Sequence, residues 1–208
     1  MDIAKFKKLP VIGILRGISL DLIEPLVETA YESGLETLEI TMNSENALGL
    51  IARAKKVAAN RMTIGAGTVM DIDSMQTAQA AGASFAVLPT LVPEVVKYCL
   101  QNKIPVFPGA LTPQEIYNAW RAGATMVKVF PARTVGPEYF REIKGPFKDI
   151  ELLACGGVTP DNMRSYFYNG ANAITFGASV FKQEWLQTRD FESIGNQIKK
   201  YIKQIPLE

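Results

Sequence analysis

One lysine lies inside an apolar stretch of the sequence, GATMVKVFPA. The residues around Lys128 are Met126, Val127, Val129 and Phe130. An apolar run of this kind predicts a strand that is buried on both faces. A buried ammonium loses several kcal/mol of hydration unless it pairs with a carboxylate or gives up its proton. We therefore expect Lys128 to have an acidic partner, or to act as a neutral amine that attacks a carbonyl carbon.

Glu39 is the acidic residue that best matches this lysine, because it also lies in an apolar run, ETLEITM. Two interpretations stay open for the two residues: a structural ion pair across the interior, or a catalytic amine with a proton-transferring carboxylate. The sequence contains no histidine. Ser-His-Asp and histidine–zinc chemistry are therefore excluded, and proton transfer falls to Asp, Glu, Lys, Tyr or Cys.

Apolar β-branched runs alternate with helical patterns along the whole chain. We expect strands over residues 10–17, 36–42, 62–69, 84–90, 105–111, 126–132, 150–157 and 173–179. Most helical segments between them end in a glycine, as at Gly34, Gly82, Gly123 and Gly170, which suits the residue that follows a helix. Eight such units predict an α/β fold, a (β/α)₈ TIM barrel, with residues 1–208 as a single domain.

In such a barrel the catalytic groups gather at the carboxyl ends of the strands. Polar or glycine residues fall at these expected ends: Arg16, Glu39, Thr41, Thr68, Thr90, Lys128, Gly156, Gly157, Gly177 and Ser179. Taken singly, each has a structural explanation, since threonine favours strands and glycine favours turns. Their shared position is what indicates a site.

Two turns near the C-terminus predict a phosphate site. The stretch CGGVTPDN follows the seventh expected strand, and FGAS follows the eighth. In CGGVTPDN we expect Thr159 to cap a helix whose first residue is Pro160. The loops after strands seven and eight of a barrel frequently bind phosphate through backbone N–H groups and a helix N-terminus.

The overall composition narrows the class of partner. Twenty-two basic against 21 acidic residues give a net charge of +1, so we expect a small-molecule substrate and no nucleic-acid or membrane partner. The two cysteines, Cys99 and Cys155, are too few for a disulfide framework. The N-terminus lacks a secretory apolar segment and no run reaches transmembrane length, so we expect a cytoplasmic protein.

The motifs together resemble one family, the class I aldolases that cleave 2-keto-3-deoxy-6-phosphogluconate and its relatives, including 4-hydroxy-2-oxoglutarate. They are ILRG, LEITMNS, GAGTV, PGALTPQEI, KVFPA and CGGVTPDN, and they extend over nearly the whole chain. The resemblance implies a Schiff base on Lys128, proton transfer by Glu39, and no metal or organic cofactor. It also implies a homotrimer.

The same resemblance assigns roles to further residues. It implies that Arg16 and Thr68 hold the substrate carboxylate, that Phe130 packs beside the Schiff base, and that Pro89 ends the fourth strand next to the substrate. The residues implied to bind phosphate are Gly156, Gly157, Gly177, Ala178 and Ser179.

Two positions depart from the pattern of the phosphogluconate enzymes. Asn43 stands in TMNS where that branch often has TLRT, and Cys155 stands where it often has threonine. Both resemble the 2-dehydro-3-deoxy-6-phosphogalactonate branch, so we expect both residues to border the substrate and leave both epimers open. The predicted products are pyruvate and glyceraldehyde 3-phosphate, or pyruvate and glyoxylate from 4-hydroxy-2-oxoglutarate. Two alternatives remain: another phosphate-binding TIM-barrel enzyme, or a catalytically inactive trimeric barrel.

Overall fold

The strands form one parallel sheet that closes on itself. The computed structural model describes residues 1–206. Its strands are β1 (Val11–Leu15), β2 (Thr37–Thr41), β3 (Thr63–Gly67), β4 (Ala86–Val87), β5 (Val106–Phe107), β6 (Gly109–Ala110), β7 (Val127–Val129), β8 (Leu152–Ala154) and β9 (Ala173–Phe176). They are ordered β5-β4-β3-β2-β1-β9-β8-β7-β6, and every pair is parallel.

The fifth expected strand is divided, which explains why nine strands stand where the sequence predicts eight. β5 pairs with β4 through Phe107, and β6 pairs with β7 through Gly109. Pro108 between them has no N–H to give to a ladder, although its carbonyl accepts a hydrogen bond of 2.9 Å from the Lys128 amide. The segment therefore joins the two ends of the sheet, and the prediction of a (β/α)₈ barrel is confirmed.

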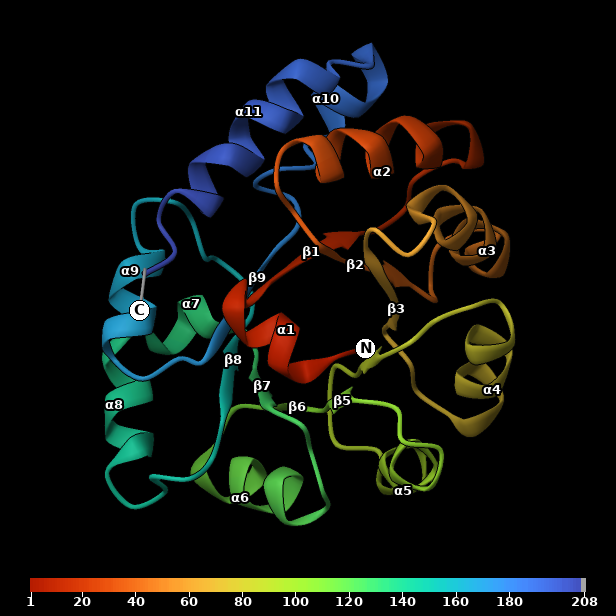
Figure 1. Cartoon of the computed structure of the whole chain (residues 1–208). Coiled ribbons are helices and arrows are strands. Elements are labelled where there is room, and N and C mark those ends of the chain that lie inside the picture. Colours follow the sequence, from red (N-terminus) through yellow and green to blue (C-terminus); the bar gives the residue numbers. More distant parts are fainter. Residues whose placement is uncertain (207–208) are drawn as a thin grey trace.

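Helices surround the barrel (Figure 1). Those that follow the strands, or lie between them, are η1 (Leu20–Leu22), α2 (Ile23–Glu32), α3 (Ala47–Ala58), α4 (Ile72–Ala80), α5 (Pro93–Gln101), α6 (Pro113–Arg121), α7 (Ala132–Val135), α8 (Glu138–Lys144), α9 (Met163–Tyr168), α10 (Gln183–Thr188) and α11 (Phe191–Ile202). The four predicted helix-ending glycines all have positive φ, between 89° and 109°. Beside each of them the next residue donates its amide to a carbonyl five positions back, as in the Leu35–Ala30 bond of 3.0 Å.

The remaining helix, α1 (Ile3–Lys8), precedes β1 and lies across the ring of strands (Figure 1). Its Phe6 is buried inside the barrel with apolar residues of the strands: Ile12, Phe85, Val87, Phe107, Met126, Leu153 and Ala173. This inner cluster is separate from the larger core between strands and helices. Because α1 fills the N-terminal end, the interior can receive a ligand only from the carboxyl ends of the strands.

No helix in the described part of the chain has the length and apolar character needed to cross a bilayer.

Candidate active site

Lys128 and Glu39 lie inside the barrel, above the apolar inner cluster. Lys128 is on β7, two residues after Met126, which directly precedes that strand, so in an extended chain both side chains point to the same face. Glu39 is on β2, and the relative exposures of Glu39 and Lys128 are 1% and 5%. The predicted pair is thus brought together at the end of the barrel that α1 leaves open.

A glycine on the neighbouring strand makes room for the Glu39 side chain. Residue 67 is the last of β3, and a Cβ atom at this position would overlap the Glu39 carboxylate. Any larger residue at Gly67 would therefore displace the carboxyl group. The motif GAGTV contains this glycine, but nothing within the motif marks Gly67 as a site residue, because the contact joins two separate strands.

The electrostatic environment of Glu39 favours a proton carrier. Burial raises the pKa of the Glu39 carboxyl above its ordinary value, and the positive charges of Lys128 and Arg16 oppose this only in part. Its Oε2 atom has no hydrogen-bond partner among the described residues. A carboxyl group whose pKa is raised holds its proton more readily than an exposed one, and its uncommitted oxygen leaves it able both to donate and to accept a proton.

The charge of Lys128 acts on Glu39. The two side chains nevertheless do not form one of the ion pairs found among residues 1–206. The Lys128 Nζ instead lies 5.0 Å from the centre of the Phe130 ring. Phe130 is 41% exposed, so this aromatic ring forms part of the wall between the amine and solvent.

Cys155 lies one strand away from Lys128, directly after β8. Its side chain is buried with a relative exposure of 4%. Burial raises the pKa of the thiol, against the opposing charge of Lys128 and a weak interaction with the Thr175 hydroxyl. Cys155 is therefore a neutral, largely apolar surface beside the amine. Thr175 on β9 was not expected at the site from sequence.

Thr68 and Pro89 follow β3 and β4 at the same end of the barrel. Thr68 has a φ of 56°, a left-handed conformation that a β-branched residue rarely adopts. Such strain costs about 1–3 kcal/mol and clusters at binding sites. The carbonyl of Pro89 packs so closely on Gly109 that a Cβ atom there would overlap it.

Arg16 and Asn43 lie in the exposed loops after β1 and β2. These two loops are joined through Ser44, whose Oγ accepts a hydrogen bond of 2.9 Å from the Gly17 amide and lies 3.0 Å from Thr41 Oγ1. Ser44 and Thr41 are both buried. The role of Ser44 could not be predicted from its own segment, because its Gly17 partner comes from the loop after β1.

The two predicted phosphate turns lie side by side after β8 and β9, strands that are paired. Gly156 and Gly157 have φ values of 90° and 87°. Four backbone amides in these turns donate no hydrogen bond to any residue within 1–206. They belong to Gly156, Gly157, Ala178 and Ser179. Unpaired amides that lie close together are suited to an anion.

The predicted start of the helix after β8 is wrong. Thr159 does not cap α9, which begins at Met163 after Asn162. The Asn162 side chain accepts a hydrogen bond from the Thr159 amide at 2.8 Å and donates one to the Gly157 carbonyl at 3.0 Å. These bonds hold residues 159–162 in a turn, which delays the helix and braces Gly157.

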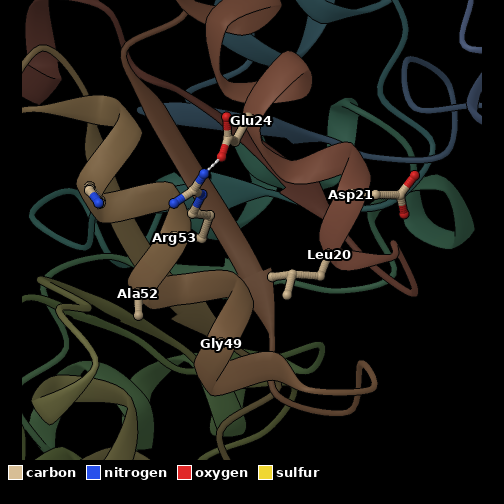
Figure 2. A pocket seen from close by; sticks show the side chains of 7 residues that line it. Leu20, Asp21, Glu24, Gly49, Ala52 and Arg53 are labelled. Atoms are coloured by element: carbon tan, nitrogen blue, oxygen red, sulfur yellow. Dashed lines mark ion pairs between the residues drawn. The ribbon is translucent and has the colours of Figure 1, made fainter.

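Two hollows occur on the surface near the loop after β1. One lies between α2 and α3 (Figure 2) and is lined by Leu20, Asp21, Glu24, Gly49, Ala52, Arg53 and Lys56. Its Glu24 and Arg53 form an ion pair. The other is lined by Gly17, Ile18, Ser19, Leu20, Glu45 and Asn46. Neither contains a buried titratable group, so the barrel mouth is the better candidate. No metal-binding cluster of His, Cys, Asp or Glu occurs within residues 1–206.

A parallel barrel with a buried amine and a buried carboxyl group at its mouth defines a class of enzyme that acts on carbonyl compounds through amine chemistry. The KDPG and KHG aldolase family model matches residues 3–197. The 2-dehydro-3-deoxy-phosphogluconate aldolase of Haemophilus influenzae is 31% identical, covering 96% of this chain and 94% of the relative. The 2-dehydro-3-deoxy-6-phosphogalactonate aldolase of Escherichia coli is 30% identical, over 95% and 97%.

Solved structures show the same architecture. A native KDPGal structure has a TM-score of 0.89 at 29% identity, covering 95% of this chain and 94% of that one. A KDPG aldolase from Legionella pneumophila, with pyruvate captured as a covalent carbinolamine, has a TM-score of 0.87 at 25% identity, over 94% and 95%. The chain belongs to the KDPG and KHG aldolase family. It is therefore a class I aldolase, and aldolases are lyases.

Proposed function

We propose that the protein cleaves a 2-keto-3-deoxy-6-phospho sugar acid to pyruvate and glyceraldehyde 3-phosphate through a Schiff base on Lys128. One observation carries the proposal. Lys128 and Glu39 are both buried and the charge of Lys128 acts on Glu39, yet they do not form a direct ion pair. A purely structural ion pair would bring the two charged groups into contact. Here a substrate carbonyl has both an amine to attack it and a carboxyl group to move its protons.

The reaction begins with addition of the neutral Lys128 amine to the C2 carbonyl of the 2-keto acid. The carbinolamine that results loses water, and Glu39 supplies the proton that the departing hydroxyl needs. The cationic iminium then accepts the electron pair of the C3–C4 bond. As this bond breaks, the C4 hydroxyl loses its proton to the Glu39 carboxylate and the aldehyde leaves.

The enamine that remains on Lys128 is resolved by the same carboxyl group. Glu39 returns a proton to C3, which regenerates the iminium, and water then releases pyruvate and the free amine. The raised pKa of Glu39 supports these alternating roles, because burial makes the protonated carboxyl group more accessible than it is for an exposed glutamate. No step requires a metal or an organic cofactor.

The two ends of the substrate carry negative charge, and we assign them to different loops. Arg16 and Thr68 would hold the carboxylate near C2, supported by the charge that Arg16 exerts on the buried Glu39. The phosphate would lie on the two turns after β8 and β9, at Gly156, Gly157, Gly177, Ala178 and Ser179. Their unpaired amides support that assignment.

Two residues bear on which epimer of the substrate the protein prefers. Relatives of similar identity act on either the phosphogluconate or the phosphogalactonate compound, and others are named KHG/KDPG aldolase. We propose that Asn43 and Cys155 border the substrate and favour the galactonate epimer. Activity toward 4-hydroxy-2-oxoglutarate, with glyoxylate as the second product, is proposed as a lesser activity.

The test is to incubate the protein with pyruvate and borohydride and to identify the modified residue by mass spectrometry. We expect one adduct per chain, on the peptide that contains Lys128. A protein that forms no adduct, yet remains folded, would contradict the proposal, and an adduct on another lysine would contradict the site.

We further propose a homotrimer, a cytoplasmic location and a single domain over residues 1–208. The trimer is supported by the family resemblance, and sedimentation equilibrium tests it directly. The single domain is supported by the inner cluster, which joins Phe6 of α1 to residues as distant as Ala173 of β9.

A further inference from the structure

Tyr201 joins the two turns to which the proposed function assigns the phosphate. It lies on α11, and its side chain is fully buried. Its hydroxyl donates a hydrogen bond of 2.8 Å to the Val158 carbonyl, in the loop after β8. The same hydroxyl lies 2.7 Å from the Oγ of Ser179, in the turn after β9. One side chain on the last helix therefore holds both loops.

The protons in this network can be assigned. A tyrosine hydroxyl has one hydrogen, and that hydrogen goes to the Val158 carbonyl. Ser179 must then donate its own hydroxyl hydrogen to the Tyr201 oxygen. The Ser179 hydroxyl is thus committed to Tyr201, and the unpaired backbone amide is the group that Ser179 can offer an anion.

The ring and the hydroxyl of Tyr201 are both fixed. The ring lies against Phe176, the last residue of β9, with centroids 4.5 Å apart. Burial raises the pKa of the Tyr201 hydroxyl to about 12, so the group stays a donor throughout the physiological pH range. A protonated, immobile hydroxyl keeps a constant spacing between the two loops that it contacts.

We propose that Tyr201 is a positioning residue that sets the spacing of the two phosphate-binding turns and thereby the preference for phosphorylated over unphosphorylated substrate. This inference rests on the proposed function. Unpaired amides on two separate loops bind one phosphate well only if the loops stay in register. Tyr201 provides that register from outside the site, without touching the substrate.

The experiment compares wild type with Tyr201→Phe, which keeps the ring and removes both hydrogen bonds. The readouts are kcat and KM, measured separately, for 2-keto-3-deoxy-6-phosphogluconate, for its galactonate epimer and for the unphosphorylated forms. We expect KM for the phosphorylated substrates to rise roughly 3- to 10-fold, the scale of one or two net hydrogen bonds. The unphosphorylated substrates and borohydride trapping with pyruvate should stay within about twofold of wild type.

Tyr98→Phe is the matched control. The Tyr98 hydroxyl donates a hydrogen bond of 2.7 Å to Gln79 Oε1, which joins α5 to α4 outside the barrel. This variant also loses a hydrogen-bonded tyrosine hydroxyl, but it should keep the preference for phosphorylated substrate. A Tyr201→Phe protein that keeps the full preference, or that loses activity equally on both kinds of substrate, would overturn the inference.

A double-mutant cycle with Ser179→Ala tests the link itself. If the two residues act through one hydrogen-bonded unit, the losses of phosphate preference in Tyr201→Phe and Ser179→Ala should not add in the double variant. Additive losses would overturn the inference. Ser179→Ala also preserves the buried ring, so it provides the measurement if Tyr201→Phe fails to fold. A wild-type protein that forms no adduct with pyruvate would instead reject the proposed function.

Discussion

At the scale of single residues, Lys128 and Glu39 divide the chemistry between a nucleophile and a proton carrier. Both are buried, and the only buried charged residues within 1–206 are these two. Since each lies on a separate strand, substitutions can test the two roles separately.

We expect Lys128→Met to abolish both borohydride trapping and cleavage while the fold remains as stable as wild type or becomes more stable. An apolar side chain of similar length replaces a buried amine, which removes a cost of desolvation. Mass spectrometry and a thermal melt check the two parts. Lys144→Met is the control, because Lys144 is a lysine outside the mouth that bonds the Ile150 carbonyl at 2.6 Å. Trapping at the wild-type level in Lys128→Met would mean that another lysine is the nucleophile.

For Glu39→Gln we expect turnover to fall by about 10²- to 10⁴-fold, the usual scale for general acid–base catalysis. The amide keeps the shape of the side chain but cannot exchange the proton. Schiff-base formation, followed by borohydride trapping, should survive at a lower rate. Nearly normal turnover would reduce Glu39 to a structural role.

We expect the difference in stability between Glu39→Gln and wild type to depend on pH. Because burial raises the pKa of Glu39, the folded protein binds this proton more tightly than the unfolded chain does. The stability that comes from this tighter proton binding is fully present at a pH below 4.5, the ordinary pKa of glutamate. It is lost as the pH rises through the higher pKa of Glu39 in the folded protein. Glu39→Gln does not lose it, so its Tm should exceed that of wild type at neutral pH and converge with it in acid. An equal Tm difference at every pH would contradict the raised pKa.

Cys155 is the residue at which we expect the substrate epimer to be decided. Cys155→Thr places a hydroxyl donor and acceptor where a buried thiol now lies beside Thr175. We expect kcat/KM for the phosphogluconate-derived substrate to rise relative to the galactonate epimer. Apolar walls discriminate by only ~1–3 kcal/mol, whereas sites that bond a substrate hydroxyl discriminate more strongly. If the ratio of the two epimers does not change, Cys155 is a packed thiol and no more.

At the scale of elements, strand β3 controls the position of a catalytic group on β2. Gly67→Ala would place a methyl group in the space of the Glu39 carboxylate, so we expect turnover to fall by about 10²-fold, the scale of a 1 Å misplacement. The cost in stability should be about 1–3 kcal/mol. Two measurements separate the steps: borohydride trapping with pyruvate reports Schiff-base formation, and the cleavage rate reports the full reaction.

Gly65→Ala on the same strand is the matched control. A Cβ atom at residue 65 would meet the ring of Phe85 in the inner cluster instead of Glu39. We expect a similar loss of stability with turnover per folded molecule much closer to wild type. Equal losses of turnover in both variants would show that β3 acts through general packing and not through Glu39.

At the scale of the whole molecule, helix α1 closes the barrel at the end opposite the site. Phe6 packs edge-on against Phe107 with a centroid distance of 6.1 Å. We expect Phe6→Ala to lower the free energy of unfolding by about 3–5 kcal/mol, as for other buried aromatics. Denaturant unfolding measures this change. Pyruvate trapping per folded molecule should stay the same, because the deletion lies below the layer of Lys128.

Tyr168→Ala controls for the loss of an aromatic side chain. Tyr168 is 87% exposed, so its removal should change stability by no more than about 0.5 kcal/mol. A destabilisation of similar size in both variants would contradict the role of α1 as a closing helix.

The sequence by itself determined the barrel and the chemical character of its mouth. Runs of apolar residues, helical periodicity and glycines after helices are local signals, and each reports the structure of its own segment. The lysine in KVFPA was recognisable for the same reason, because a charge within an apolar strand conflicts with its immediate neighbours.

The tertiary structure decided what no single segment could specify. Gly67 gives space to a carboxylate on another strand, Ser44 joins two loops, and Tyr201 links turns that precede it by 43 and 22 residues. The left-handed φ of Thr68 is likewise not signalled by its own residue type, because a β-branched residue rarely adopts it. Contacts between distant segments leave no periodic pattern in the chain, and only closure of the barrel brings their partners together.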